Sequence, residues 1–129
     1  MCIFCKIING EIPSRKIYED DNVIAILDIS QATLGHALVI PKKHYENILA
    51  IDDIDYLNVM KAVKIVANKL NSHLPLKGLN ILNNCNEIAG QTVMHFHVHV
   101  IPRYEENDIT IKFDSHDYNL DEVLTKINL

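Results

Sequence analysis

Three histidines alternate with two apolar residues in the segment 95–99, which reads His-Phe-His-Val-His. The surrounding pattern predicts a strand over residues 94–101, and alternate side chains of a strand point to the same side. We therefore expect three imidazoles in a row on one face, with about 7 Å between successive Cα atoms. Imidazole titrates near neutral pH, and such a row can bind a metal ion or provide a nucleophile.

Three interpretations of this row differ in what they require. A half-exposed strand with a histidine-rich polar face is the simplest, but unpaired polar groups are rarely buried. A three-histidine metal site suits two rings at positions i and i+2, whereas a third ring at i+4 lies too far along a flat strand. A nucleophile needs only a middle ring, His97, with one nitrogen donating to a backbone carbonyl and the other lone pair free. His97 would attack phosphorus, and His99 would donate to a phosphate oxygen.

The elements that must position these side chains follow from periodicity and turn signals. No repeat or linker divides residues 1–129, so we expect a single domain with one core. Helices are predicted over residues 2–9, from Asp52 or Asp53 to residue 71, and over 120–127. Strands are predicted over residues 15–19, 22–27, 36–40, 79–82, 94–101 and 109–113. Short turns between strands favour an antiparallel sheet with helices packed on it, an α+β fold.

The composition and charge of the chain argue against some classes of binding partner. Hydrophobic residues make up 48% and charged residues 22% of the chain, an ordinary globular balance. The net charge is −5 and no run of lysine or arginine stands out, so we expect neither nucleic acid nor an anionic membrane as a partner. The sequence contains no apolar run long enough to span a bilayer and no signal-like start, which favours the cytoplasm.

The three cysteines form no even disulfide framework, so reduced thiols or metal ligands are expected. Cys2 and Cys5 have the spacing of half a zinc site, and Cys85 does not extend that pattern. A pair of reduced cysteines on a helix remains the alternative.

The histidine segment and several others resemble the histidine triad (HIT) superfamily, whose motif is His-φ-His-φ-His-φ-φ, with φ apolar. Residues 95–101 fill every position of that motif. Further segments resemble the family in order and spacing, at residues 2–8, 27–30, 35–44 and 90–93. The likeness covers residues 1–104 and is greatest to the small bacterial HIT proteins and the Hint branch. The tail, residues 105–129, lacks the glycine-rich run and the tryptophan of the Hint branch.

The resemblance implies a fold and an activity. The fold is HIT-like, with about five antiparallel strands and two main helices, and with the sheet extended across a homodimer. The activity is hydrolysis of purine nucleotide adducts, phosphoramidates among them, through a nucleotidyl intermediate on His97, with no organic cofactor. AMP or GMP and their adducts would be the ligands, and the departure of the tail leaves the preferred leaving group open. A nucleotide-binding regulatory protein with weak residual hydrolysis is the alternative.

The resemblance also implies roles for individual residues. The catalytic set comprises His97, His99, Gln91 and Thr92, the last two beside the phosphate and the leaving group. Asp28 would bind the ribose hydroxyls, and Asn84 would bind near ribose and phosphate, with its neighbour Asn83 competing for that role. The walls around the base would be apolar and come from Ile3, Phe4, Ile7, Leu27 and Ile29.

The resemblance finally implies a structural zinc ion. Its ligands would be Cys2, Cys5, His44 and His95, a closed tetrahedral set with no open position for catalysis. His36 would be a structural residue near the site. In this interpretation the first histidine of the motif belongs to the metal, and zinc would stiffen the segment that presents His97.

Overall fold

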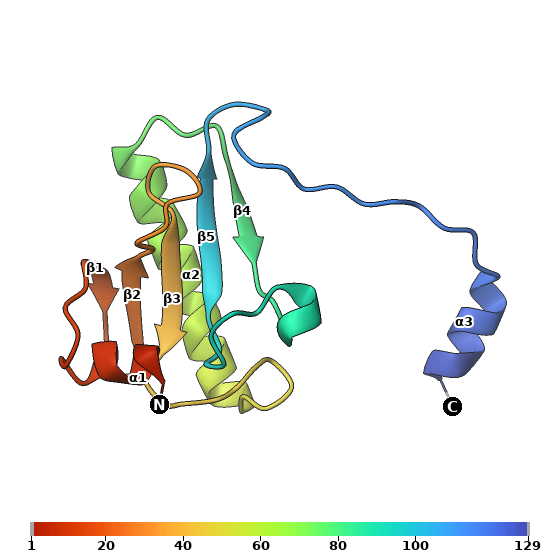
Figure 1. Ribbon diagram of the computed structural model, residues 1–129, viewed down its shortest axis with the longest axis horizontal. Helices are drawn as coiled ribbons and strands as arrows, with labels where there is room; N and C mark the ends of the chain where they lie inside the picture. The colour runs from red at the N-terminus through yellow and green to blue at the C-terminus, as the bar shows by residue number, and fades with distance from the viewer. Residues whose placement is uncertain (1, 129) are drawn as a thin grey trace.

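The computed structural model describes residues 2–128, in which five antiparallel strands form one sheet in the order β1-β2-β3-β5-β4 (Figure 1). The strands are β1 (Lys16–Glu19), β2 (Val23–Leu27), β3 (Ala37–Pro41), β4 (Gly78–Leu82) and β5 (Val98–Arg103). The helices are α1 (Ile3–Ile8), α2 (Asp53–His73), the single 3₁₀ turn η1 (Glu87–Ala89) and α3 (Leu120–Ile127). The expected α+β class and antiparallel sheet are confirmed.

The long helix α2 covers one face of the sheet. It buries Val59, Ala62, Val63, Val66 and Leu70 against the inward-facing side chains of β2, β3 and β5, among them Val39 and Val98. Asp52 begins the helix, because its carboxylate accepts from the backbone N–H of Asp55 at 2.7 Å. This face forms the larger core and fixes β5, the strand that the histidine segment enters.

The short helix α1 lies on the opposite face of the sheet. Phe4 of α1 packs on the side chains of β2 and β3 that point away from α2, namely Ile24, Ile26, Leu38 and Ile40. Because side chains of a strand alternate, His99 on β5 points to this same face, where it is opposite Leu38 in the ladder. The α1 face is therefore the one on which the chemistry of the histidines must occur.

The predicted strand over residues 94–101 is wrong in its first half. β5 begins only at Val98, so His95 and His97 precede the strand and His99 alone lies in the ladder. The backbone before β5 makes other hydrogen bonds: Phe96 N–H donates to the carbonyl of Tyr45 at 2.7 Å. Asn83 donates through its side chain to the carbonyl of His97 at 2.9 Å. These partners hold the segment next to β5 without a neighbouring strand.

The C-terminal part of the chain leaves the body as an extended arm that ends in α3 (Figure 1). The strand predicted over residues 109–113 is wrong, because the arm runs beyond the sheet and has no strand edge beside it. The predicted helix over 120–127 is confirmed as α3. Among residues 2–128 no helix is both long and apolar enough to cross a membrane.

Candidate functional site

A hollow of about 210 Å³ lies between α1, the end of β2 and the histidine segment. It collects nine of the residues that the sequence predicted for the site, from four separate stretches of the chain. Its walls come from Ile3, Phe4, Ile7, Leu27, Asp28, Ile29, Thr92, His97 and His99, together with Ile26, Leu38 and Val93. A mostly apolar hollow with a few polar groups, here two imidazoles and one carboxylate, is typical of a binding site for a small organic molecule.

His97 is held as a neutral ring with one free nitrogen. Its Nδ1 lies 2.7 Å from the carbonyl oxygen of His95, which can only accept, so Nδ1 carries the proton. Burial lowers the pKa of His97, and its side chain is only 6% exposed. The Nε2 lone pair is therefore the reactive atom of this ring, as a nucleophile requires. The Phe4 ring stands edge-on to His97, with 5.1 Å between the centroids.

His36 fixes the protonation of His99. The backbone N–H of Ala32 donates to Nδ1 of His36 at 3.1 Å, so the proton of this neutral ring must lie on Nε2. Nε2 of His36 lies 2.9 Å from Nδ1 of His99 and donates to it. His99 therefore carries its own proton on Nε2, where it can donate to a ligand in the hollow.

His36, which the resemblance places near the site as a structural residue, also contacts His99, and the sequence did not predict that contact. Its place one residue before β3 puts it against the histidine segment only because β3 and β5 pair, with Leu38 opposite His99. The register of two strands distant in the sequence would have been needed to find it. The adjoining Asp28 carboxylate lies 3.6 Å from Nε2 of His36 and adds negative charge on the same side.

The loop before the histidine segment contains three of the polar residues predicted for the site, Asn84, Gln91 and Thr92. Gln91 is 1% exposed, and its amide donates to the carbonyls of Glu46 (2.6 Å) and Val93 (3.0 Å) while its oxygen accepts from Asn86 N–H (2.8 Å). Since backbone groups occupy both ends of this amide, the structure places Gln91 as a brace of the loop, outside the lining of the hollow.

Asn84 and Thr92 lie on either side of that brace. Thr92 lines the hollow. The Asn84 amide lies 3.4 Å from the carbonyl of Gly90, and Asn84 is not among the residues that line the hollow. The neighbouring Asn83, the alternative residue for the role of Asn84, donates instead to the backbone carbonyl of His97.

A second cluster joins the N-terminus to the histidine segment. It consists of Cys2, Cys5, His44 and His95, whose ligand atoms all lie within 4.8 Å of one another. His95 Nε2 donates to the carbonyl of Pro41 at 2.8 Å, which leaves the Nδ1 lone pair of His95 directed at the cluster. Burial lowers the pKa of His95 to about 4, so the ring is neutral as a ligand must be.

The spacing of the cluster fits a zinc ion. Zinc bonds of about 2.3 Å to sulfur and about 2.0 Å to nitrogen put tetrahedral S and N ligands roughly 3.5 Å apart. The observed Sγ–Nδ1 distances are 3.3 Å for Cys2 with His95, and 3.5 Å for Cys5 with either His44 or His95. Four ligands of the right types at these separations leave no open position, which is the form of a structural site.

The neutral state of His99 predicts a loss of stability in mild acid. Burial lowers the pKa of His99 to about 4, with His97 and His36 adding to the shift and Asp28 opposing it. Between pH 6.5 and pH 4 the unfolded chain binds a proton that the folded chain does not, so stability falls as the pH falls. Replacing His99 with asparagine, whose side-chain oxygen can still accept from His36, removes this contribution.

We expect urea unfolding to show that wild type loses stability from pH 7 to pH 5 more steeply than H99N, by on the order of 1 kcal/mol. Equal losses for the two proteins would contradict a neutral, buried His99.

The sequence is similar to a known family model and to several known proteins. The family model described as "HIT domain" matches residues 9–106. An uncharacterized HIT-like protein of Methanocaldococcus jannaschii is 49% identical over 128 residues, 98% of either chain. The adenosine 5'-monophosphoramidase of Candida albicans is 42% identical over 81% of this chain and 72% of its own. The adenylylsulfatase of Arabidopsis thaliana is 38% identical over 82% of this chain and 54% of its own.

Solved structures match the fold over nearly the whole chain. The crystal structure of a HIT family protein from Bacillus anthracis has a TM-score of 0.93 and 45% identity, over 98% of this chain and 92% of that one. A coverage this complete includes the arm and α3. A zinc-bound histidine triad family protein from Mycobacterium smegmatis has a TM-score of 0.81 and 35% identity, over 89% of this chain and 84% of that one.

Proposed function

Because the chain belongs to the HIT domain family, we propose that it hydrolyses adducts of purine nucleotides through a covalent nucleotidyl intermediate on His97. The observation that carries the proposal is the free Nε2 lone pair of His97, a residue that lines a hollow with apolar walls, a second imidazole and one carboxylate. Two of the relatives are named for cleaving adenylyl compounds: one is an adenosine 5'-monophosphoramidase and the other an adenylylsulfatase.

The proposed reaction has two steps on one phosphorus atom. Nε2 of His97 attacks the α-phosphorus, the bond to the leaving group breaks, and the departing nitrogen or oxygen takes a proton from solvent. Water then attacks the same phosphorus and loses a proton to solvent, the P–N bond to His97 breaks, and the nucleoside monophosphate leaves. His99 Nε2–H donates to a non-bridging oxygen, where negative charge increases in both transition states.

The substrate is recognised by the remaining walls of the hollow. The purine would lie against Ile3, Phe4 and Ile7 of α1, which are apolar and stand beside Leu27 and Ile29. Oδ1 of Asp28 already accepts from the backbone N–H of Ser30 at 2.8 Å, so Oδ2 remains for the ribose hydroxyls. Thr92 and Asn84 are proposed to contact the phosphate side, whereas Gln91 holds their loop in place.

The zinc cluster supports this site without taking part in a step. Cys2, Cys5, His44 and His95 would hold a zinc ion, whose role is to tie the N-terminus to the segment before β5. The carbonyl of His95 accepts from His97, so a rigid residue 95 keeps the nucleophile oriented. A zinc-bound relative has the same fold, which supports this assignment.

Turnover assays distinguish an enzyme from a nucleotide-binding regulator. The purified protein is incubated with adenosine 5'-monophosphoramidate, with adenylyl sulfate and with a diadenosine polyphosphate, and release of AMP is followed. The proposal predicts many turnovers with at least one of these compounds. Tight AMP binding by calorimetry, together with less than one turnover of every compound, would instead support the regulatory alternative.

A pair of substitutions at His36 tests the proton arrangement on His99. Leucine removes the Nε2–H donor, so we expect H36L to lower kcat by about 10- to 100-fold with a much smaller change in KM. Glutamine places an N–H near the position of the His36 Nε2–H, so H36Q is expected to recover most of the loss. Equal activity of the two variants would contradict the proposed role of His36.

A further inference from the structure

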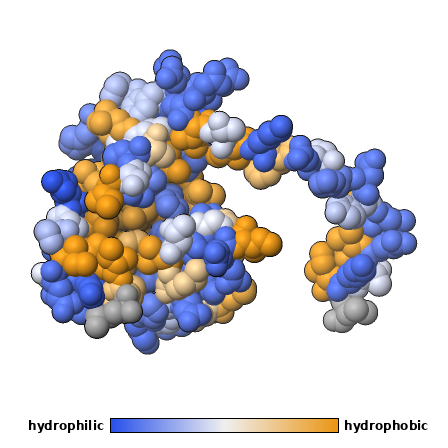
Figure 2. All heavy atoms as spheres, viewed as in Figure 1, coloured by the Kyte–Doolittle hydropathy of each residue, from blue (hydrophilic) through white to orange (hydrophobic). Residues whose placement is uncertain are grey.

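A second hollow, of about 350 Å³, adjoins the one that His97 and His99 line. We call the second one the side hollow and the earlier one the histidine hollow. Six residues line both hollows: Ile3, Ile7, Ile26, Leu27, Asp28 and Ile29. Figure 2 shows apolar side chains gathered on this face of the molecule, over α1 and the neighbouring strands. A ligand can therefore extend from one hollow into the other.

The histidine hollow alone is small for a nucleotide. Its volume is about 210 Å³, whereas protein pockets for small molecules usually have about 300–1,000 Å³. Asp28, which is proposed to bind the ribose hydroxyls, lines both hollows. The phosphate and the base are attached to different carbons of the ribose. A phosphate placed beside His97 and His99 therefore leaves the side hollow for the base.

The segment between α1 and β1 forms the wall that belongs to the side hollow alone. This segment is held at both of its ends. The backbone N–H of Glu11 donates to the carbonyl of Lys6 on α1 at 2.9 Å, and that of Leu27 on β2 donates to the carbonyl of Arg15 at 2.9 Å. The segment contributes Ile12, Pro13, Ser14 and Arg15 to the lining. Arg15 is therefore fixed by its backbone at the end of β2, beside the hollow.

The guanidinium of Arg15 has its donors free. The chain has two arginines, and they differ in their contacts within residues 2–128. Arg103 donates to the side chains of Asn80, at 2.7 Å, and of Asp108, whereas the Arg15 guanidinium has neither a hydrogen bond nor an ion pair there. Arg15 is exposed and lines a mostly apolar hollow. Its N–H groups can therefore donate to a ligand that occupies the hollow.

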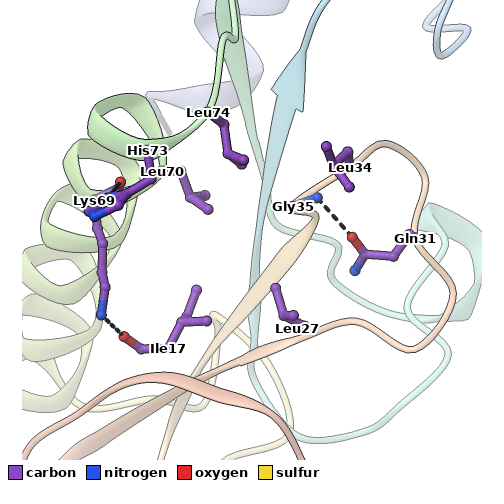
Figure 3. Close-up of a pocket in the computed structure, with 9 residues that line it drawn as sticks. All are labelled: Ile17, Leu27, Gln31, Leu34, Gly35, Lys69, Leu70, His73 and Leu74. Carbon is purple, nitrogen blue, oxygen red and sulfur yellow. Dashed lines mark hydrogen bonds between the residues drawn. The ribbon is translucent and has the colours of Figure 1, made fainter.

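The other polar side chains of the side hollow do not select between bases. The Gln31 amide donates to the carbonyl of His36 at 2.8 Å, and its oxygen accepts from the backbone N–H of Gly35 at 2.8 Å, as Figure 3 shows for the second bond. The hydroxyl of Ser14 can donate as well as accept. Arg15 is the group in this lining that only donates, so we expect the hollow to favour a base with acceptors on its exposed edge.

The two common purines differ at the edge that such a donor meets. Guanine has acceptors at both O6 and N7, whereas adenine has an acceptor at N7 and a donor in its N6 amino group. Arginine bonds with two N–H groups to O6 and N7 of guanine, which is the commonest specific contact in the recognition of bases in DNA. With adenine, one of these N–H groups would face the N6 amino group. A donor at this edge therefore favours guanine.

We propose that Arg15 determines base specificity, by donating to O6 and N7 of a guanine that lies in the side hollow. Guanine nucleotides are then preferred to adenine nucleotides. This inference deepens the proposed function and rests on it, since a nucleotide must be the ligand. A base in this position would also cover Ile29, an apolar side chain that is 94% exposed at the edge of both hollows.

Equilibrium binding, measured by calorimetry, tests this preference without any turnover. The full chain is titrated with GMP, IMP, 7-deaza-GMP and AMP. These four share the ribose and the phosphate, so any attraction between Arg15 and the phosphate cancels in the ratio of their Kd values. IMP keeps O6 and N7, and 7-deaza-GMP lacks N7. We expect GMP to bind about 10-fold more tightly than AMP, IMP to bind nearly as tightly as GMP, and 7-deaza-GMP to bind several-fold more weakly.

Substitution of Arg15 assigns the preference to its donors. R15M keeps an unbranched side chain without N–H groups, and we expect its Kd values for GMP and AMP to agree within about twofold. The matched control is K16M, because Lys16 pairs with Glu19 at 3.1 Å and does not line the side hollow. K16M should keep the wild-type ratio.

Three results would overturn the role of Arg15 and leave the proposed hydrolysis standing. They are equal Kd values for GMP and AMP in wild type, an unchanged ratio in R15M, and binding of 7-deaza-GMP as tight as that of GMP. A protein that binds none of the four nucleotides would instead overturn this inference together with the proposed function.

Discussion

Replacing His97 with asparagine is expected to lower kcat for hydrolysis of adenosine 5'-monophosphoramidate by at least about 10³-fold. The side-chain amide of asparagine can still donate to the carbonyl of His95, as His97 Nδ1 does at 2.7 Å, so the fold around the segment is preserved. What disappears is the Nε2 lone pair, for which asparagine has no counterpart. The measurement is AMP release under saturating substrate.

The matched control for this loss is His116→Asn, since His116 is exposed on the arm, far from the hollow. H116N should keep wild-type kcat. H97N should keep the thermal midpoint of wild type within a few degrees and should bind AMP. If H97N retained more than about a tenth of the activity, a nucleophilic role for His97 would be untenable, because such residues contribute far more than tenfold.

Replacing Cys5 with alanine is expected to release the zinc ion and to cost about 3–5 kcal/mol of folding stability. The cluster ties Cys2 and Cys5 at the N-terminus to His44 and His95, residues far away in the sequence, so its loss frees several segments together. At the size of this domain such a cost corresponds to a drop of roughly 10–20 °C in the thermal midpoint. Zinc content is measured by atomic absorption and stability by calorimetry.

Two control variants distinguish loss of the zinc ion from a general loss of stability. Cys85→Ser should retain zinc and its thermal midpoint, because Cys85 lies outside the cluster. H97N should also retain zinc, since His97 contributes no ligand atom. Full zinc content in the Cys5→Ala variant would contradict the assigned ligands. Zinc loss in H97N would instead support a metal held by the three histidines of the motif.

Much of the fold could be predicted from the sequence because local patterns determine it. The structure has three local features that the sequence predicted: the helix cap at Asp52, the hairpin between β1 and β2, and the periodicity of α2. The start of β5 could not be predicted in this way. Residues 94–97 alternate like a strand, but a loop carbonyl and the Asn83 side chain take their hydrogen bonds.

The candidate site also contains features that the sequence predicted and contacts that it did not. The apolar residues of α1, Asp28 and the last two histidines of the motif meet in one hollow, as their motif positions predicted. Gln91 and His36 make contacts that the sequence did not predict, because these contacts depend on which groups lie beside them in space. The amide of Gln91 braces a loop, and His36 sets the proton on His99 through a contact between distant strands. Such contacts depend on strand register and loop packing, which short sequence patterns do not predict.

Trapping the covalent intermediate tests the central claim most directly. The protein is mixed with adenosine 5'-monophosphoramidate, quenched in base within the first turnover, digested and examined by mass spectrometry. The account predicts a peptide that contains residues 95–99 and is heavier by one adenylyl group, with fragmentation placing that group on His97. Turnover with no adenylylated peptide, or with the group on another residue, would contradict it.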